Sequence, residues 1–135
     1  MSDVGMRKSS EAEHQIKNTM RLDVSIYGRE SVINIGKDVL RVLGAPVSVC
    51  LKVNHGMDSF VVMPCDEKEA MSFRVPDDIM FNGSRQMRVT SRSFVTGLLA
   101  VNGMEANHTY KISGTYSEKN NAVIFNMSDI RRYRK

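Results

Sequence analysis

Alternation of apolar and polar residues predicts that most of this chain forms short β-strands. Leu22, Val24 and Ile26 alternate with polar neighbours, which is the period of two of a half-buried strand. Residues 28–31 have the composition of a turn, and extended structure resumes over 32–35. Further short strands are predicted over 47–51, 60–63, 87–90, 110–112 and 123–125, with one more around Phe73 and Val75.

Two short helices interrupt the strands. Within 37–43 the apolar residues Val39, Leu40 and Leu43 have the spacing of one helical face, and Gly44 follows as a left-handed stop. Within 93–101 a second apolar stripe, which includes Leu98, ends at the pair 102–103. We expect Leu40 and Leu98 to be core positions.

The order strand, helix, hairpin therefore occurs twice, over 21–65 and 84–128, joined by an acidic connector at 66–83. We favour an internal duplication of a β-α-β-β unit, although a small α+β protein can repeat such elements by chance. Each half is too small to bury a core alone. The predicted fold class is α+β, mainly β: a small pseudo-two-fold barrel, or crossed sheets, within a single domain at 21–130.

The two ends of the chain lie outside this pattern. Residues 1–20 lack an apolar period and are expected to form a flexible arm. The last five residues, 131–135, form a basic tail around one tyrosine. Such a tail can neutralise phosphates and stack on a base, or it can simply keep a chain end soluble.

Charge makes nucleic-acid binding possible without requiring it. The 135 residues carry 19 basic and 15 acidic side chains, a net charge of +4, and residues 84–135 hold nine basic and three acidic ones. Many domains that bind no nucleic acid are equally basic. A solvated surface therefore explains the charge as well as a nucleic-acid partner does.

Recognisable catalytic and metal-binding motifs are absent from the sequence. Cys50 and Cys65 are predicted to be reduced thiols of a cytoplasmic protein, with neither a disulfide scaffold nor a Cys-based zinc site. His14, His55 and His108 show no paired-ligand spacing. No phosphate loop, nucleophile motif or membrane-spanning stretch occurs. We expect no enzyme activity, no cofactor, no metal and no membrane partner.

Residues 35–44, Ile-Gly-Lys-Asp-Val-Leu-Arg-Val-Leu-Gly, preceded by Gly28-Arg29 and followed by two strands, suggest a family. Together they resemble the AbrB/MraZ/SpoVT-type swapped-hairpin DNA-binding domain over about residues 22–65, with a weaker echo over 87–127. The resemblance implies that basic residues at turns and helix starts lie across DNA. These candidate DNA-binding residues are Arg29, Lys37 and Arg41 in the first half, Arg85, Arg88 and Arg92 in the second, and Arg131, Arg132, Arg134 and Lys135 in the tail.

Two functions from different classes remain open. The first is a small regulator or antitoxin-like module that binds double-stranded DNA, as a pseudo-symmetric monomer or a homodimer. The second is a protein-binding inhibitor of the anti-CRISPR or anti-restriction type, encoded by a mobile element, with no DNA binding of its own. Any single candidate cation could instead pair locally, for example Lys37 or Arg41 with Asp38.

Overall fold

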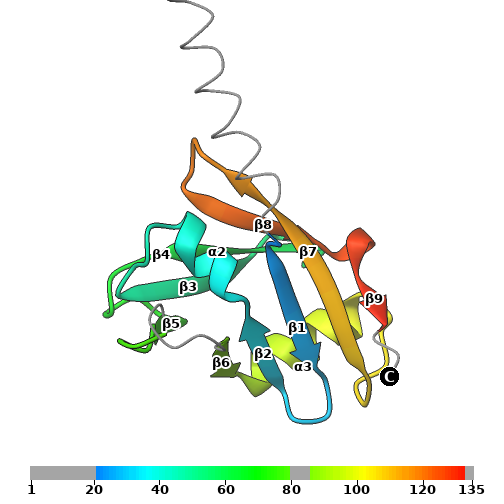
Figure 1. Cartoon of the computed structure of the whole chain (residues 1–135). Helices are drawn as coiled ribbons and strands as arrows, with labels where there is room; N and C mark the ends of the chain where they lie inside the picture. The colour runs from blue at the N-terminus through cyan, green and yellow to red at the C-terminus, as the bar shows by residue number, and fades with distance from the viewer. Residues whose placement is uncertain (1–20, 80–85, 133–135) are drawn as a thin grey trace, which may run out of the picture.

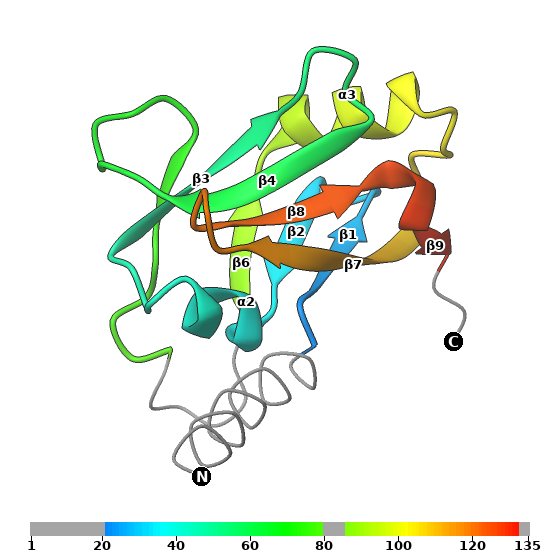
Figure 2. The same cartoon turned by 90° about the horizontal axis from the view of Figure 1, so that it is seen from above.

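The computed structural model describes residues 21–79 and 86–132 (Figures 1 and 2). The expected arm at 1–20 and three candidate residues, Arg85, Arg134 and Lys135, lie outside the described residues. Within the described ranges, no helix has the length and apolar content needed to cross a membrane.

Strands dominate the described chain. In order, the elements are β1 (Asp23–Tyr27), β2 (Val32–Ile35), α2 (Lys37–Val42), β3 (Ser48–Val53), β4 (Ser59–Pro64), β5 (Ser72–Arg74), β6 (Met87–Thr90), α3 (Arg92–Val101), β7 (Thr109–Ser117), β8 (Ala122–Asn126), the 3-10 turn η1 (Met127–Asp129) and β9 (Arg131–Arg132). The strands and both helices predicted from periodicity are all confirmed. The first helix is one residue shorter than predicted, and the second begins one residue earlier.

The strands form one antiparallel sheet that curls into a nearly closed barrel (Figure 2). Its order is β5-β3-β4-β8-β7-β1-β2-β6, with β9 added beside β7. Among the described residues, β5 and β6 do not pair, so the barrel is open between them. This confirms a mainly β, barrel-like fold with two helices.

The long strand β7 joins the two halves of the barrel. Its first part pairs with β1 and its second part with β8. Gly114 stands at the change of partner, where an added Cβ would lie 2.7 Å from the ring of Phe125. The Gly114 N–H donates a 2.7 Å hydrogen bond to the Leu22 carbonyl. Glycine is therefore required here because the backbone passes directly over a buried aromatic ring.

One hydrophobic core is shared by both halves of the chain. The ring of Phe60 stacks on that of Phe125 at 4.9 Å and meets the edge of Phe94 at 5.6 Å. Leu40 and Leu98, the expected core positions, are both 0% exposed. Because each aromatic contact joins residues far apart in the sequence, neither half holds a complete core.

Both helices end where glycine permits a left-handed turn. Gly44 has φ +89° and Gly103 has φ +67°. After Gly44, the Ala45 N–H returns to the Leu40 carbonyl at 2.9 Å, and after Gly103 the Met104 N–H returns to Leu99 at 2.8 Å. The predicted stops are therefore confirmed.

The connector and the tail both contribute strands to the sheet. The strand predicted around Phe73 and Val75 is β5, and the connector also contributes Val75 and Ile79 to the core. Arg131 and Arg132 are not part of a free tail, because they form β9 and pair with Lys111 and Tyr110 of β7.

The prediction of two reduced thiols is wrong in this structure. Cys50 and Cys65 form a disulfide with their Cα atoms 5.8 Å apart. They are 15 residues apart in sequence, and the pairing of β3 with β4 makes them diagonal neighbours on one face. Cys50 is buried as predicted, but its neighbours Val49 and Leu51 point into the core while it does not.

Replacing Leu98 by alanine should lower the free energy of unfolding by about 2–5 kcal/mol, because it leaves a cavity in the shared core. Val101→Ala, at a side chain 58% exposed in the same helix, is the matched control and should change it by less than about 0.5 kcal/mol. Urea unfolding measures both. A fragment of residues 21–65 that unfolds cooperatively on its own would contradict the shared core.

Candidate nucleic-acid interface

Strand pairing places five polar residues in one line across the outside of the barrel. Residues that pair directly in an antiparallel sheet point to the same side. Ser25 of β1 pairs with Asn34 on one side and Lys111 on the other. The pairing continues from Asn34 to Arg88 and from Lys111 to Arg131. We call this line the outer row: Arg131, Lys111, Ser25, Asn34 and Arg88.

The outer row faces away from the core. Val24 and Ile26, which flank Ser25 in the chain, are both 0% exposed, so the alternation of β1 directs Ser25 outward. Arg88 and Arg131 are exposed at the two ends of the row. In the adjacent line of the same face, Tyr27 pairs with Thr109 and is half-buried. The face is thus polar, basic at its ends, and carries one aromatic ring.

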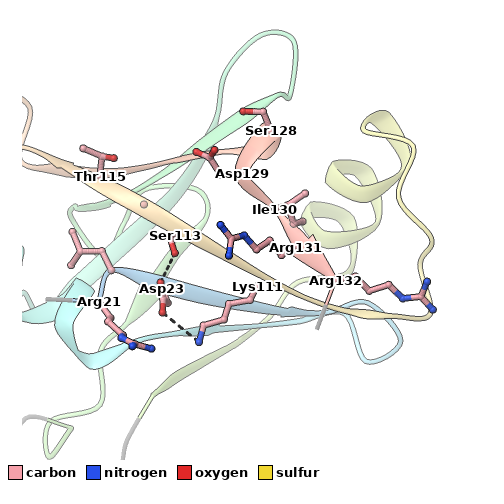
Figure 3. Close-up of a pocket in the computed structure, with 12 residues that line it drawn as sticks. Arg21, Asp23, Lys111, Ser113, Thr115, Ser128, Asp129, Ile130, Arg131 and Arg132 are labelled. Atoms are coloured by element: carbon pink, nitrogen blue, oxygen red, sulfur yellow. Dashed lines mark hydrogen bonds and ion pairs between the residues drawn. The ribbon is translucent and has the colours of Figure 1, made fainter. Parts of the chain in front are cut away.

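A groove of about 790 Å³ opens beside the Lys111 end of the row (Figure 3). It lies where β1, β7, η1 and β9 meet. Its lining is largely polar and includes four basic side chains and two carboxylates. The lining residues are Arg21, Leu22, Asp23, Lys111, Ser113, Gly114, Thr115, Ser128, Asp129, Ile130, Arg131 and Arg132.

Asp23 organises the floor of the groove. Its Oδ1 accepts a 2.8 Å hydrogen bond from the Ser113 hydroxyl, and its Oδ2 lies 3.5 Å from the Lys111 ammonium (Figure 3). Neither the Arg21 nor the Arg131 guanidinium has a side-chain partner within the described ranges. The groove therefore keeps an excess of positive charge, and guanidinium groups can hold phosphate oxygens in pairs.

The 3-10 turn η1 sets the position of Arg131. Gly114 of β7 pairs with Phe125. Lys111 lies three residues before Gly114, but its partner Arg131 lies six residues after Phe125. The partner strand thus carries three extra residues, which form η1. Asn126 caps this turn by accepting a 3.4 Å hydrogen bond from the Ser128 N–H. The insertion forms one wall of the groove. After it the chain pairs with β7 again, and this places Arg131 beside Lys111.

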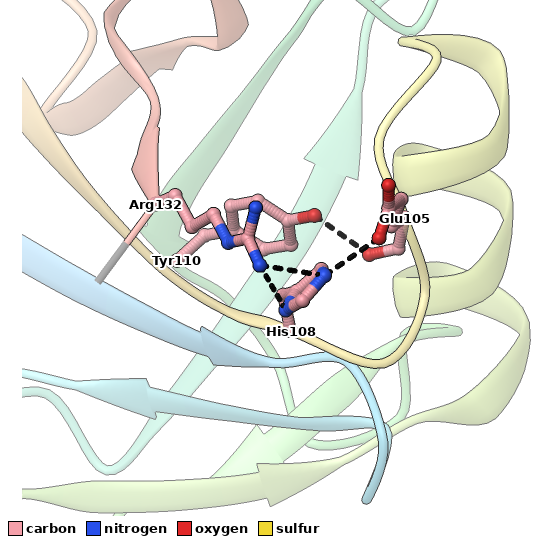
Figure 4. A network of polar contacts seen from close by, with 4 residues as sticks. All are labelled: Glu105, His108, Tyr110 and Arg132. Carbon is pink, nitrogen blue, oxygen red and sulfur yellow. Dashed lines mark hydrogen bonds and ion pairs between the residues drawn. The ribbon is translucent and has the colours of Figure 1, made fainter. Parts of the chain in front are cut away.

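Arg132 differs from Arg131 because it belongs to a polar network (Figure 4). Its Nη2 lies 3.0 Å from Nδ1 and 2.9 Å from Nε2 of His108, whose Nε2 lies 2.6 Å from Glu105 Oε2. The Tyr110 hydroxyl donates to the Glu105 carbonyl at 2.7 Å. An imidazole protonated on Nε2 donates to Glu105 and accepts from Arg132 through Nδ1. Arg132 therefore anchors β9 to the 105–108 loop.

The other described site residues predicted from the sequence lie off the outer row. Arg29 lies in the exposed β1–β2 turn, and a hydrogen bond of 3.0 Å from the Ser91 N–H to the Ser31 carbonyl brings the start of α3, with Arg92, close to that turn. Lys37 and Arg41 stand at the opposite end of β2, on α2.

Arg41 pairs with Asp38 at 3.1 Å, so the local-pairing alternative holds for this residue. Of the described candidates, only Arg88 and Arg131 lie on the outer row.

Sequence reasoning missed Arg21 and Lys111. Lys111 stands between Tyr110 and Ile112, two buried residues of β7, so alternation alone marks it as pointing outward. The sequence does not show which residues lie beside Lys111, because the outer row joins five strands whose order is set by long-range pairing. Arg21 precedes β1, and its backbone N–H donates a 3.3 Å hydrogen bond to Asp38.

Comparison with known proteins adds no relative: this chain matches no protein-family model, no curated protein and no solved structure.

Gly28 fixes the end of β1 against the 105–108 loop, and we expect Gly28→Ala to destabilise the fold by about 1–3 kcal/mol. An added Cβ would lie 2.2 Å from the Ala106 carbonyl oxygen, and the Gly28 N–H donates to His108 at 3.0 Å. Gly56→Ala is the control, since nothing lies within 4 Å of a Cβ there. Equal urea midpoints for the two variants would refute the close approach.

Proposed function

We propose that this protein binds double-stranded DNA through the outer row and the adjoining groove, as a small regulator or antitoxin-like module. One observation carries the proposal: Arg131, Lys111 and Arg88 stand on a single register line of the sheet, with uncharged polar residues between them. Phosphate contacts supply most of the affinity of such proteins, and they require cations on one accessible face.

The spacing of these cations suits a duplex. The row crosses five strands, so its ends lie about 19 Å apart along the curved sheet at about 4.8 Å per strand. A major groove is about 12 Å wide. Cations at the two ends can therefore face phosphates on both sides of a groove, while Ser25 between them faces the groove itself. Arg21, whose guanidinium has no side-chain partner among the described residues, lines the adjoining groove and extends the basic surface beyond Lys111.

The pairing of strands supports the duplication and the swapped-hairpin resemblance. Exchanging β1 with β5, which lies in the connector, β2 with β6, β3 with β7 and β4 with β8 turns each observed pairing into an observed pairing, except that β1–β2 and β7–β9 have no counterpart in the described chain. The β2–β6 and β4–β8 pairings each map onto themselves, as pairs beside a two-fold axis do. The β1–β2 hairpin also lies between β7 and β6, strands of the other half.

Salt dependence tests the proposal. Wild type should bind a labelled duplex at about 50 mM salt and lose affinity steeply toward about 200 mM. Lys111→Ala and Arg131→Ala should each weaken binding to all sequences alike and lower the slope of log affinity against log salt by about 0.9. Fluorescence anisotropy provides the readout.

Lys119→Ala is the matched control, because Lys119 is an exposed cation in the β7–β8 turn, away from the outer row. It should leave the slope unchanged. If Lys119→Ala weakens binding as much as Arg131→Ala does, the outer row is not the interface. If wild type has no duplex affinity at the low-salt end, DNA binding fails and the protein-binding inhibitor becomes the better account.

A further inference from the structure

A second cluster of reactive side chains lies on the other half of the barrel, where the loop at 66–71 covers β3. Cys50, Cys65 and Glu69 each offer one ligand atom, and the three atoms lie within 4.8 Å of one another. Cys50 is fully buried, Cys65 is half-buried and Glu69 is exposed. The cluster therefore has a buried base and one side open to solvent.

The Glu69 carboxylate accepts no hydrogen bond from the intact disulfide. Glu69 Oε2 lies 3.4 Å from Cys50 Sγ, but a disulfide sulfur has no proton to donate. Among the described residues, its ion-pair partner is the Lys52 ammonium, 3.5 Å away on the same face of β3. A negative oxygen held against a sulfur becomes useful when that sulfur is a thiol or a metal-bound thiolate.

The backbone fixes all three positions. Cys50 lies within β3, and the Cys65 N–H, at the end of β4, donates a 3.1 Å hydrogen bond to the Ser48 carbonyl. Asp66 begins a tight turn, since its carbonyl accepts from the Glu69 N–H at 3.0 Å and its Oδ1 accepts from the Lys68 N–H at 3.0 Å. This turn brings Glu69 back over the sheet toward the two cysteines.

We propose that the reduced protein binds one zinc-type divalent cation through Cys50, Cys65 and Glu69, with water in the fourth position. A dithiol reductant first gives two electrons and two protons to the Cys50–Cys65 bond and is itself oxidised to a disulfide. The two thiols then release their protons to solvent as the cation binds their thiolates. The disulfide and the metal are alternative states of the same pair of cysteines.

The geometry fits a tetrahedral ion. With Zn–S bonds of about 2.3 Å and a Zn–O bond of about 2.1 Å, the sulfur-to-oxygen edge is about 3.6 Å and the sulfur-to-sulfur edge about 3.8 Å. The Cys50-to-Glu69 edge is already 3.4 Å. Binding therefore needs mainly a rotation of the Cys65 side chain, which lies at a strand end. Two thiolates favour zinc-type ions over magnesium or calcium.

The solvent-exposed side of the cluster is typical of a metal site with three protein ligands and one open position, and not of a structural site closed by four protein ligands. The Glu69 side chain is 46% exposed, which leaves room for a water molecule at the ion. The sequence predicted no Cys-based zinc site because the cysteines lack ligand spacing. The two cysteines are 15 residues apart in sequence, and the hydrogen bonding of β3 to β4 brings them together.

Cobalt(II) titration of the full chain under anaerobic, reducing conditions tests the site. Wild type should bind one Co²⁺ per chain with a thiolate-to-cobalt charge-transfer band, and Zn²⁺ should displace the Co²⁺ and bleach the band. Cys50→Ser and Cys65→Ser should each weaken binding by more than about 100-fold, and Glu69→Gln by about 10- to 100-fold. Glu67→Gln is the matched control in the same loop and should bind as wild type does.

Several results would overturn the site. One is a reduced wild type that shows no thiolate band at one equivalent of Co²⁺. Another is a Cys65→Ser variant that keeps the full band. Metal taken up without this band, as by histidines elsewhere in the chain, also counts against it. Circular dichroism verifies that the cysteine variants fold, and Glu69→Gln, at a side chain that is 46% exposed, keeps the test decisive if they do not. Wild type oxidised to the disulfide must show no band.

Discussion

The stacking of Phe60 on Phe125 shows the constraint on which this structure depends: neither half of the chain has a core until it pairs with the other half. The β2–β6 and β4–β8 pairings bring the halves together, and β7 links the two parts of the sheet. The apolar faces then close on one another with Leu40 and Leu98 inside. Chain entropy makes any smaller unit unfavourable, because about 45 residues bury too little apolar surface to offset it.

The same pairing determines where chemistry can lie, because every residue that alternates with a core residue points outward. Leu51 N–H donates to the Met71 carbonyl in the first half, and Gly114 N–H donates to the Leu22 carbonyl in the second. Cys50 comes directly before Leu51, and Ser113 comes directly before Gly114. Under the proposed duplication these are equivalent places on the barrel. Ser113 lines the basic groove, and Cys50 belongs to the cysteine cluster covered by the 66–71 loop.

Local features of the fold were predictable from the sequence, and long-range ones were not. Alternation over 22–26 and 87–90 predicted strands, and Gly44 and Gly103 predicted helix ends, because these signals need only neighbouring residues. The contact between Lys111 and Arg131 depends on a three-residue insertion in the partner strand, and the disulfide depends on a β3–β4 register. No local pattern encodes either of them. The sequence therefore predicted that basic residues form the candidate site. Of the described candidates, however, only Arg88 and Arg131 lie on the outer row.

Amide chemical-shift mapping by NMR is the sharpest test of the proposed contact between the outer row and DNA. On addition of a short duplex at low salt, the account predicts that the largest shifts fall on β1, β2, β6, β7 and β9 near Ser25, Asn34, Arg88, Lys111 and Arg131, while the amides of α3 beyond its first turn stay unchanged. Shifts confined to α3 and the β3–β4 hairpin, or no shifts at all, would contradict it.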